Sequence, residues 1–208
     1  MNRIHDISPP LRPSIAVFPG DTPLRREVSA DMHDGASLTL SSMHATAHLG
    51  AHADSPGHTD ADGADIASQP LDAYLGRCQV ITVDVGRGAR ILPQHVTVAL
   101  DEARVLFRTG TFPDPDRWND DFAALSPELV RMLADNGVRL VGIDTPSVDP
   151  FSSMDLPAHA ACVTHDVRVL EGIVLDGVAD GTYELIALPL RLVGFDASPV
   201  RAVLRLLP

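Results

Sequence analysis

Three apolar runs in the middle of the chain have the length and composition of buried β-strands. They are Cys78–Val85, Ala103–Arg108 and Val138–Asp144, and each is rich in the residues that fill strands covered on both faces. Two further strands are predicted at Tyr183–Val193 and Val200–Leu206. The pattern therefore predicts a sheet built mainly from the second half of the chain.

The N-terminal third is irregular, and helices are few. Prolines surround Ile15–Phe18, which predicts short strands and a hairpin near the N-terminus. Ser37–Met43 alternates and predicts a half-buried strand. The clearest helix is Pro127–Asn136, because Ser126 can cap it, proline suits its first position and Gly137 follows its end. Because strands outnumber helices, the pattern predicts a mixed α/β fold.

Composition supports one domain and excludes several classes of partner. With 45% hydrophobic residues and no linker or repeat, residues 1–208 are expected to form a single domain. The net charge is −12 and all 16 basic residues are arginine, which disfavours nucleic acid and anionic membranes. The first residues lack a signal peptide's apolar stretch, and the longest apolar run, Leu185–Leu190, is too short to cross a membrane. We expect a cytoplasmic protein whose two cysteines, Cys78 and Cys162, are free and buried.

Four of the nine histidines lie in the short string between His44 and His58. The string also contains His48, His52 and Asp54, and imidazole with carboxylate is a ligand set for Zn²⁺, Mn²⁺ or Fe²⁺. The alternative is that these histidines are solvated in a loop. The clustering favours a metal site, and we assign no role to His44, which precedes the glycine of the string.

The spacing of these ligands requires a bent chain. On one helix, His48 and His52 would share a face but Asp54 would lie on the far side. A straight strand from His48 to Asp54 would be about 20 Å long, at roughly 3.3 Å per residue. We therefore predict an extended segment that curls at Gly50 and again at Pro56–Gly57, before His58.

A second imidazole and a second carboxylate follow downstream. His159 lies in a short predicted helix, and Glu171 lies among apolar residues of the strand after it. A buried, unpaired glutamate is costly, so Glu171 either needs a cation or faces solvent at the strand end. If both residues reach the histidine string, the site could hold two ions.

Other sources of a nucleophile are missing. No serine lies in a G-x-S-x-G turn, the nearest approach being Gly35–Thr39. The absence of lysine excludes a lysine base or a Schiff base. A metal ion is therefore the visible source of an activated water.

Three blocks in this order resemble the metal-dependent cyclase family. They are Phe18-Pro-Gly-Asp-Thr-Pro23, His48-x-Gly50-x-His52-x-Asp54-x-Pro56-x-His58, and Ile143-Asp144-x-Pro146-Ser147-x-Asp149-Pro150, followed by Leu170-Glu171-Gly172-Ile173. The similarity runs from about Asp6 to Pro208 and is greatest to bacterial kynurenine formamidases (arylformamidases). It implies a mixed-sheet, swivelling β/β/α fold and a homodimer. It also implies a hydrolase acting on a linear amide C–N bond, which converts the small molecule N-formyl-L-kynurenine to L-kynurenine and formate in the kynurenine pathway of tryptophan degradation.

The resemblance also implies a set of site residues and two Zn²⁺ ions per subunit. Nitrogen and oxygen ligands also accept Mn²⁺ or another divalent ion. By motif position, His48 and His52 would bind the first metal, Asp54 would bridge both metals, His159 would bind the second, Glu171 would be shared, and His58 would donate and accept the proton.

The chain departs from the family pattern at positions that bear on the substrate. Phe18 stands where the family usually has tryptophan, Ala160 replaces a second histidine, and Ser152-Ser153 lacks a common lysine. We expect Phe18 to contact the substrate, the alternative being a core residue of a hairpin. Two other functions stay open, an isatin hydrolase or another hydrolase of the same family and a non-catalytic metal-binding protein.

Overall fold

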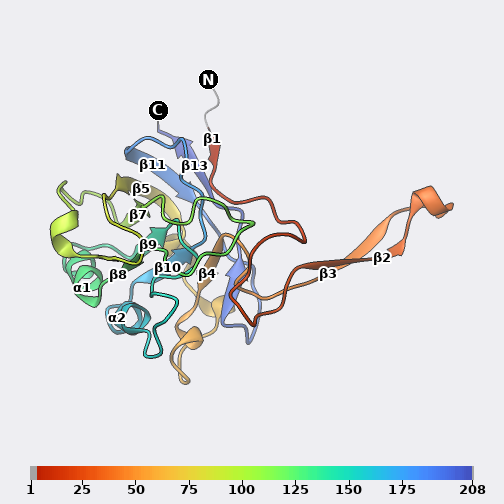
Figure 1. Ribbon diagram of the computed structural model, residues 1–208, viewed down its shortest axis with the longest axis horizontal. Helices are drawn as coiled ribbons and strands as arrows, with labels where there is room; N and C mark the ends of the chain where they lie inside the picture. The colour runs from red at the N-terminus through yellow and green to blue at the C-terminus, as the bar shows by residue number, and fades with distance from the viewer. Residues whose placement is uncertain (1–3, 208) are drawn as a thin grey trace.

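The computed structural model describes residues 4–207, and a nine-stranded mixed sheet forms its centre (Figure 1). Met1–Arg3 and Pro208, which the single-domain prediction includes, lie outside the described residues. The central strands β5, β7, β9 and β10 are parallel, and the strands on either side of them are antiparallel. The order across the sheet is β1 (Ile4–Asp6), β13 (Val203–Leu206), β11 (Gly181–Ile186), β5 (Leu75–Thr82), β7 (Arg104–Arg108), β9 (Leu140–Ile143), β10 (Arg168–Glu171), β4 (His52–Asp54) and β12 (Ala197–Pro199).

The sheet confirms the predicted mixed α/β fold and most of the predicted strands. The three apolar runs form β5, β7 and β9, although each strand is shifted or shortened at its ends. The strand predicted over Tyr183–Val193 ends at Ile186, and the segment with Pro189 after it is irregular because proline cannot donate a ladder hydrogen bond. Residues 188–193, the last part of the predicted strand, are exposed or half-buried.

Side chains of the sheet alternate between two apolar clusters. Leu106 of β7 points into one cluster, and Phe107 next to it points into the other. The two α-helices, α1 (Pro127–Asp135) and α2 (Pro157–Thr164), cover the Phe107 face (Figure 1). Helix α1 begins where predicted, since the Ser126 hydroxyl accepts a hydrogen bond from the Leu129 amide (3.1 Å). On the other face the sheet curls around its own cluster, which includes residues from both β4 and β13.

Two small sheets are separate from the main sheet, and one of them corrects a prediction. The segment Ile15–Phe18 contains no strand, because the prolines around it remove backbone donors, and Ile15 packs against Leu24 and Leu49 instead. The N-terminal hairpin is formed by β2 (Arg25–Ala30) and β3 (Leu40–His44), and it projects away from the body (Figure 1). The strand expected to be half-buried over Ser37–Met43 is therefore exposed on both faces. The other pair is β6 (Arg90–Ile91) and β8 (Ala124–Leu125).

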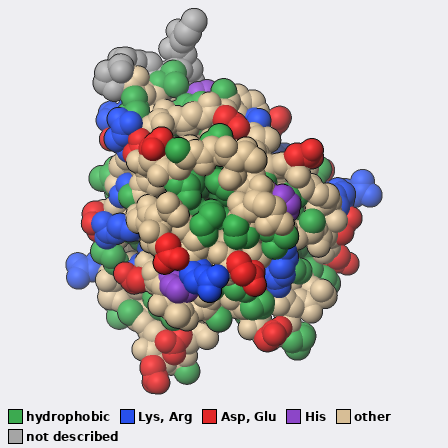
Figure 2. Space-filling model, turned by 90° about the vertical axis from the view of Figure 1, so that its left-hand side faces the viewer, with side chains coloured by type: hydrophobic (Ala, Val, Ile, Leu, Met, Phe, Trp, Pro, Cys, Tyr) green, Lys and Arg blue, Asp and Glu red, His purple; other side chains and the backbone are tan. Residues whose placement is uncertain are grey.

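Strands from both ends of the chain meet in the main sheet, where β1 pairs with β13. We infer from this pairing that the chain forms one domain. Figure 2 shows the side of the body away from the hairpin, where acidic and arginine side chains are interspersed around a central apolar area. Within residues 4–207, no helix combines the length and apolar character needed to cross a membrane.

Both cysteines are free and buried, as expected. Burial raises the pKa of Cys78 and of Cys162 to about 12. At pH 8 only about one thiol in ten thousand is then ionised, and the thiolate is the reactive form. We expect no reaction of the native protein with 5,5′-dithiobis(2-nitrobenzoate) within minutes. In guanidinium chloride, where the chain is unfolded, both cysteines should react. Fast labelling of the native protein would contradict this burial.

Candidate metal centre

The antiparallel pair β4 and β10 places three candidate ligands on one face of the sheet. Glu171 lies directly opposite His52, and Asp54 lies opposite Val169. Because side chains two residues apart on a strand share a face, His52, Asp54 and Glu171 all point the same way. Val169 belongs to the cluster under the helices, so these ligands face α2, which carries His159.

A tight turn before β4 bends the histidine string as predicted. Gly50 has a φ of +58°, and its carbonyl accepts a hydrogen bond from His52 Nδ1 (2.9 Å). That carbonyl also lies against Gly172, where an added Cβ would be 2.2 Å from the Gly50 oxygen. Glycine at both positions therefore lets the turn approach the end of β10. The hydrogen bond leaves Nε2 of His52 as the nitrogen free for a ligand.

Two imidazoles and two carboxylates converge at this point. His52 Nε2 lies 3.2 Å from Glu171 Oε2 and 3.5 Å from Asp54 Oδ1. His159 Nε2 lies 3.4 Å from Glu171 Oε1 and 3.5 Å from Asp54 Oδ2. All four side chains are at most 5% exposed. Each carboxylate therefore lies between the same two rings, and Glu171 is buried rather than solvent-facing.

Several of these atoms are buried without a hydrogen bond. His52 Nε2, His159 Nε2 and both carboxylate oxygens of Asp54 have no hydrogen-bond partner among the described residues. Their neighbours lie at ion-pair distances but without hydrogen-bond geometry. Unpaired polar atoms are costly to bury, and a divalent cation would satisfy lone pairs on nitrogen and oxygen together. The donor set therefore fits a metal ion.

Imidazole and carboxylate groups of opposite charge stabilise one another in the cluster. Burial alone would raise the pKa of Asp54, but the rings of His159 and His48 hold it well below its usual value. Burial also opposes a charged His159, yet hydrogen bonding to Asp149 and the two buried carboxylates raises its pKa well above its usual value. The carboxylates thus favour positive charge around them, which a metal ion supplies.

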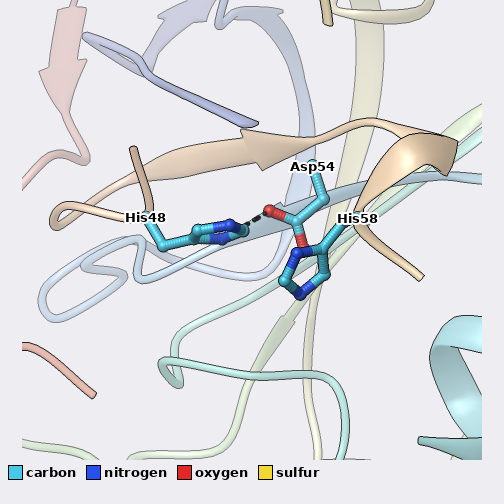
Figure 3. Close-up of side chains that lie close together, drawn as sticks. All are labelled: His48, Asp54 and His58. Carbon is cyan, nitrogen blue, oxygen red and sulfur yellow. Dashed lines mark ion pairs between the residues drawn. The ribbon is translucent and has the colours of Figure 1, made fainter. Parts of the chain in front are cut away.

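His48 and His58 also lie beside the Asp54 carboxylate (Figure 3). His48 Nδ1 is 3.1 Å from Asp54 Oδ1. Burial lowers the pKa of His48, but its carboxylate neighbours Asp54 and Asp196 outweigh this and raise it to about 10. The sequence places His58 outside the metal shell, but the structure brings it within ligand range of His48 and Asp54. His44, by contrast, is exposed in β3.

Asp196 is a site residue that sequence reasoning missed. Its Oδ2 lies 2.9 Å from His48 Nε2 and 3.3 Å from His58 Nδ1. It directly precedes β12, which pairs with β4, so the sheet brings it to the histidine string. No motif surrounds it in the sequence, and it could not have been found without the strand pairing.

Asp149 is a second missed residue, although it lies inside a block that resembles the family. It is fully buried and accepts hydrogen bonds from the amides of Ala158 and His159 and from His159 Nδ1 (3.0 Å). Arg90 donates to its other oxygen (3.1 Å). Asp149 therefore fixes the start of α2 and turns His159 Nε2 towards Asp54 and Glu171.

Changing Asp149 to asparagine is expected to weaken metal binding by about 10–100-fold, the usual effect of losing a partner that orients a metal-bound histidine. The metal affinity would be measured by competition with a chromogenic chelator. Asp166→Asn, at an exposed aspartate after α2, is the matched control. Unchanged affinity in a folded Asp149→Asn protein would show that His159 needs no such support.

A cavity of about 360 Å³ opens beside His48 and His52. Phe18 lines it together with Trp118, and the two rings meet edge to face with centroids 5.3 Å apart. Phe151 also packs on Phe18, at 5.2 Å. Phe18 thus lies at the cavity and outside any hairpin core. Sequence reasoning missed Trp118, the one tryptophan of the chain, because no motif connects it to the histidines.

Comparison with known proteins assigns the chain to a family. The chain matches the family described as "Putative cyclase" over residues 5–150. Two solved structures of similar fold are described as a potential metal-dependent hydrolase with cyclase activity (26% identity, 97% of this chain and 96% of that one, TM-score 0.83) and a predicted metal-dependent hydrolase from Bacillus stearothermophilus (27%, 97% of each, TM-score 0.80). Isatin hydrolase A from Labrenzia aggregata shares the fold at 23% identity, over 98% of this chain and 93% of that one, with a TM-score of 0.85. With most of its length matched by the family and its fold shared end to end, the chain belongs to the putative cyclase family.

Proposed function

We propose that the protein is a metal-dependent amidohydrolase that converts N-formyl-L-kynurenine and water to L-kynurenine and formate. The observation that carries this proposal is the buried carboxylate of Asp54, which has no hydrogen-bond partner, belongs to two groups of candidate metal ligands, and lies next to His48 and His52 of the cavity wall. The family resemblance supports the substrate.

Two groups of candidate ligands share Asp54. His52, Asp54 and Glu171 form one group whose ligand atoms lie within 4.8 Å of one another, and His48, Asp54 and His58 form the other. We assign His48 and His52 to a first ion, His159 to a second, and Asp54 and Glu171 to both, with Zn²⁺ as the expected metal. Such ions lower the pKa of a bound water to about 7 and polarise a carbonyl oxygen.

His58 is the residue we assign to proton transfer. Formamide hydrolysis moves one proton from the attacking water to the nitrogen that leaves, so a single imidazole can accept and then donate it. Asp196 lies 3.3 Å from His58 Nδ1 and holds the ring so that Nε2 is left for the substrate. The His58 side chain is partly exposed, so its ring is open to proton exchange.

Substrate recognition is assigned to the cavity walls. Phe18 and Trp118 line the cavity and Phe151 packs on both of them, which forms an aromatic cluster that an aminophenyl ring can extend by edge-to-face contact. Arg108 also lines the cavity, and its guanidinium suits the carboxylate of an amino acid. A neutral ring such as isatin offers no carboxylate to this arginine.

Replacing Arg108 with methionine is therefore expected to separate the two candidate substrates. The KM for N-formyl-L-kynurenine should rise about tenfold or more, which is the loss of a hydrogen bond to a charged group, and hydrolysis of isatin should be unchanged. Arg77→Met, at an exposed arginine of β5, is the control. An equal effect on both substrates would argue for a structural role of Arg108. If only isatin is hydrolysed, the protein is an isatin hydrolase.

A further inference from the structure

The cavity beside the metal centre carries one positive and one negative side chain that the metal-ligand set does not use. Arg108 lies at the end of β7, and Asp176 lies in the segment between β10 and β11. Arg108 lies 3.8 Å from Asp180, whereas the Asp176 side chain makes no ion pair or hydrogen bond within the described residues. The cavity wall therefore offers an unpaired carboxylate and a guanidinium to a ligand.

Asp176 is held at the tip of a tight turn. The Val178 amide donates to the Leu175 carbonyl (3.1 Å), and Gly177 has a φ of +73°. A positive φ at the third residue is typical of a type II turn, where glycine is favoured. Leu175 and Val178 are buried on either side of the tip. These buried flanks fix the turn, so Asp176 has a defined place on the cavity wall.

Arg108 is attached to the same turn. Its Nη1 donates to the carbonyl of Val178 (2.5 Å), two residues after Asp176. Asp180, the carboxylate near its Nη2, accepts a hydrogen bond from the Thr82 amide (3.0 Å). A guanidinium has five N–H groups, so these contacts leave donors for a ligand. The fold thus sets the spacing of the positive and negative groups before a ligand binds.

The other carboxylate on the cavity wall is already engaged. Asp144 is 9% exposed, and it accepts hydrogen bonds from the amides of Thr109 and Gly110 and from the Thr109 hydroxyl (2.6–3.0 Å). These bonds hold the loop that follows β7. Asp176, by contrast, is exposed. Of these two carboxylates, Asp176 is therefore the one free to bind a cationic group.

The charged pair and the metal centre share one wall of the cavity. Residues 172–175 directly follow Glu171, line the cavity without a break and lead to Asp176. The wall is fixed at its start, because the Gly172 amide donates to the Thr145 carbonyl (2.8 Å). A molecule that reacts at the metal end of this wall can therefore place a charged end at its other end.

We propose that Asp176 binds the α-ammonium group of the substrate while Arg108 binds its α-carboxylate, so that the cavity selects free α-amino acids. An ammonium group loses hydration in a cavity and needs an anionic partner to offset that cost. The inference rests on the proposed function for the formamide that is hydrolysed, and it adds the residue that recognises the amino group. An aryl formamide whose α-amino group is acylated or missing should therefore bind weakly.

Calorimetric binding of three ligands to the metal-loaded protein tests the proposal. L-Kynurenine carries both charges, 4-(2-aminophenyl)-4-oxobutanoate lacks the ammonium group, and kynuramine lacks the carboxylate. The wild type should bind L-kynurenine about tenfold or more tightly than either analogue, which is the effect of one hydrogen bond to a charged group. None of these ligands has a formamide, so the measurement does not depend on turnover.

Variants assign each charge to its residue. Asp176→Asn should remove the preference for L-kynurenine over the analogue without the ammonium group, and should not weaken binding of that analogue. Arg108→Met should instead remove the preference over kynuramine. Asp101→Asn, at an exposed aspartate outside the cavity, is the matched control and should bind all three ligands as the wild type does.

The proposal is overturned if the wild type binds L-kynurenine no more tightly than the analogue without the ammonium group. It is also overturned if Asp176→Asn keeps the preference or weakens all three ligands alike, which would indicate a structural role. Turnover of N-formyl-L-kynurenine, measured in parallel, shows whether the proposed function fails instead. A protein with the Asp176-dependent preference but no formamide hydrolysis would retain the binding pair and lose the proposed reaction.

Discussion

Replacing Asp54 with asparagine should empty the metal centre and abolish hydrolysis. Asp54 is 4% exposed and both of its oxygens lack hydrogen-bond partners, so we expect its carboxylate to hold the metal. Losing the metal returns the pKa of the attacking water from about 7 towards 15.7, and kcat should fall by at least about three orders of magnitude. Metal content by inductively coupled plasma mass spectrometry and turnover of N-formyl-L-kynurenine measure the two effects.

The control for this variant is Asp135→Asn, at an exposed aspartate that ends α1. It should keep the metal and the rate of the wild type. An Asp54→Asn protein that still binds two equivalents of metal would show that the cluster is held by other residues. Asparagine has nearly the same shape as aspartate, so a folded variant is expected and is checked by circular dichroism.

His58→Ala should give the opposite combination, a full metal site with little turnover. A positioned general acid and base contributes about 10²–10⁴-fold to a rate, and kcat should fall by that amount. His58 Nδ1 already has Asp196 as a partner, and three other imidazoles remain at the centre, so metal affinity should stay close to that of the wild type. Metal content and kcat, measured on the same preparation, separate the two roles.

The matched control is His165→Ala, at a half-buried histidine just after α2. This change should leave both metal content and kcat unaltered. If His58→Ala loses metal together with activity, His58 is a ligand with His48 and Asp54, which their mutual proximity allows. The proton would then need another carrier.

Much of the fold and the centre of the site could be predicted from local sequence. The apolar runs that form β7 and β9 are buried on both faces and the run that forms β5 is buried in part, and such runs are recognisable without knowledge of their neighbours. The curl around Gly50 followed from bond lengths and strand rise alone. Glu171 could be suspected because a charge in an apolar strand needs a partner, but only the pairing of β10 with β4 places it opposite His52.

The remaining features depend on contacts between distant segments. Asp196 reaches His48 and His58 through the pairing of β12 with β4, and Trp118 reaches Phe18 through a loop. Neither has a local signal. The strand predicted over Ser37–Met43 is exposed rather than half-buried. Its residues alternate as those of a half-buried strand do, although the hairpin β2–β3 projects away from the body.

Metal content and substrate turnover should be measured together on one preparation of the unaltered protein. We expect about two equivalents of divalent metal per chain, hydrolysis of N-formyl-L-kynurenine, loss of this activity on removing the metal with a chelator, and its return with Zn²⁺. Stoichiometric metal with no hydrolysis of N-formyl-L-kynurenine or of isatin would contradict it and leave a metal-binding protein without this catalysis.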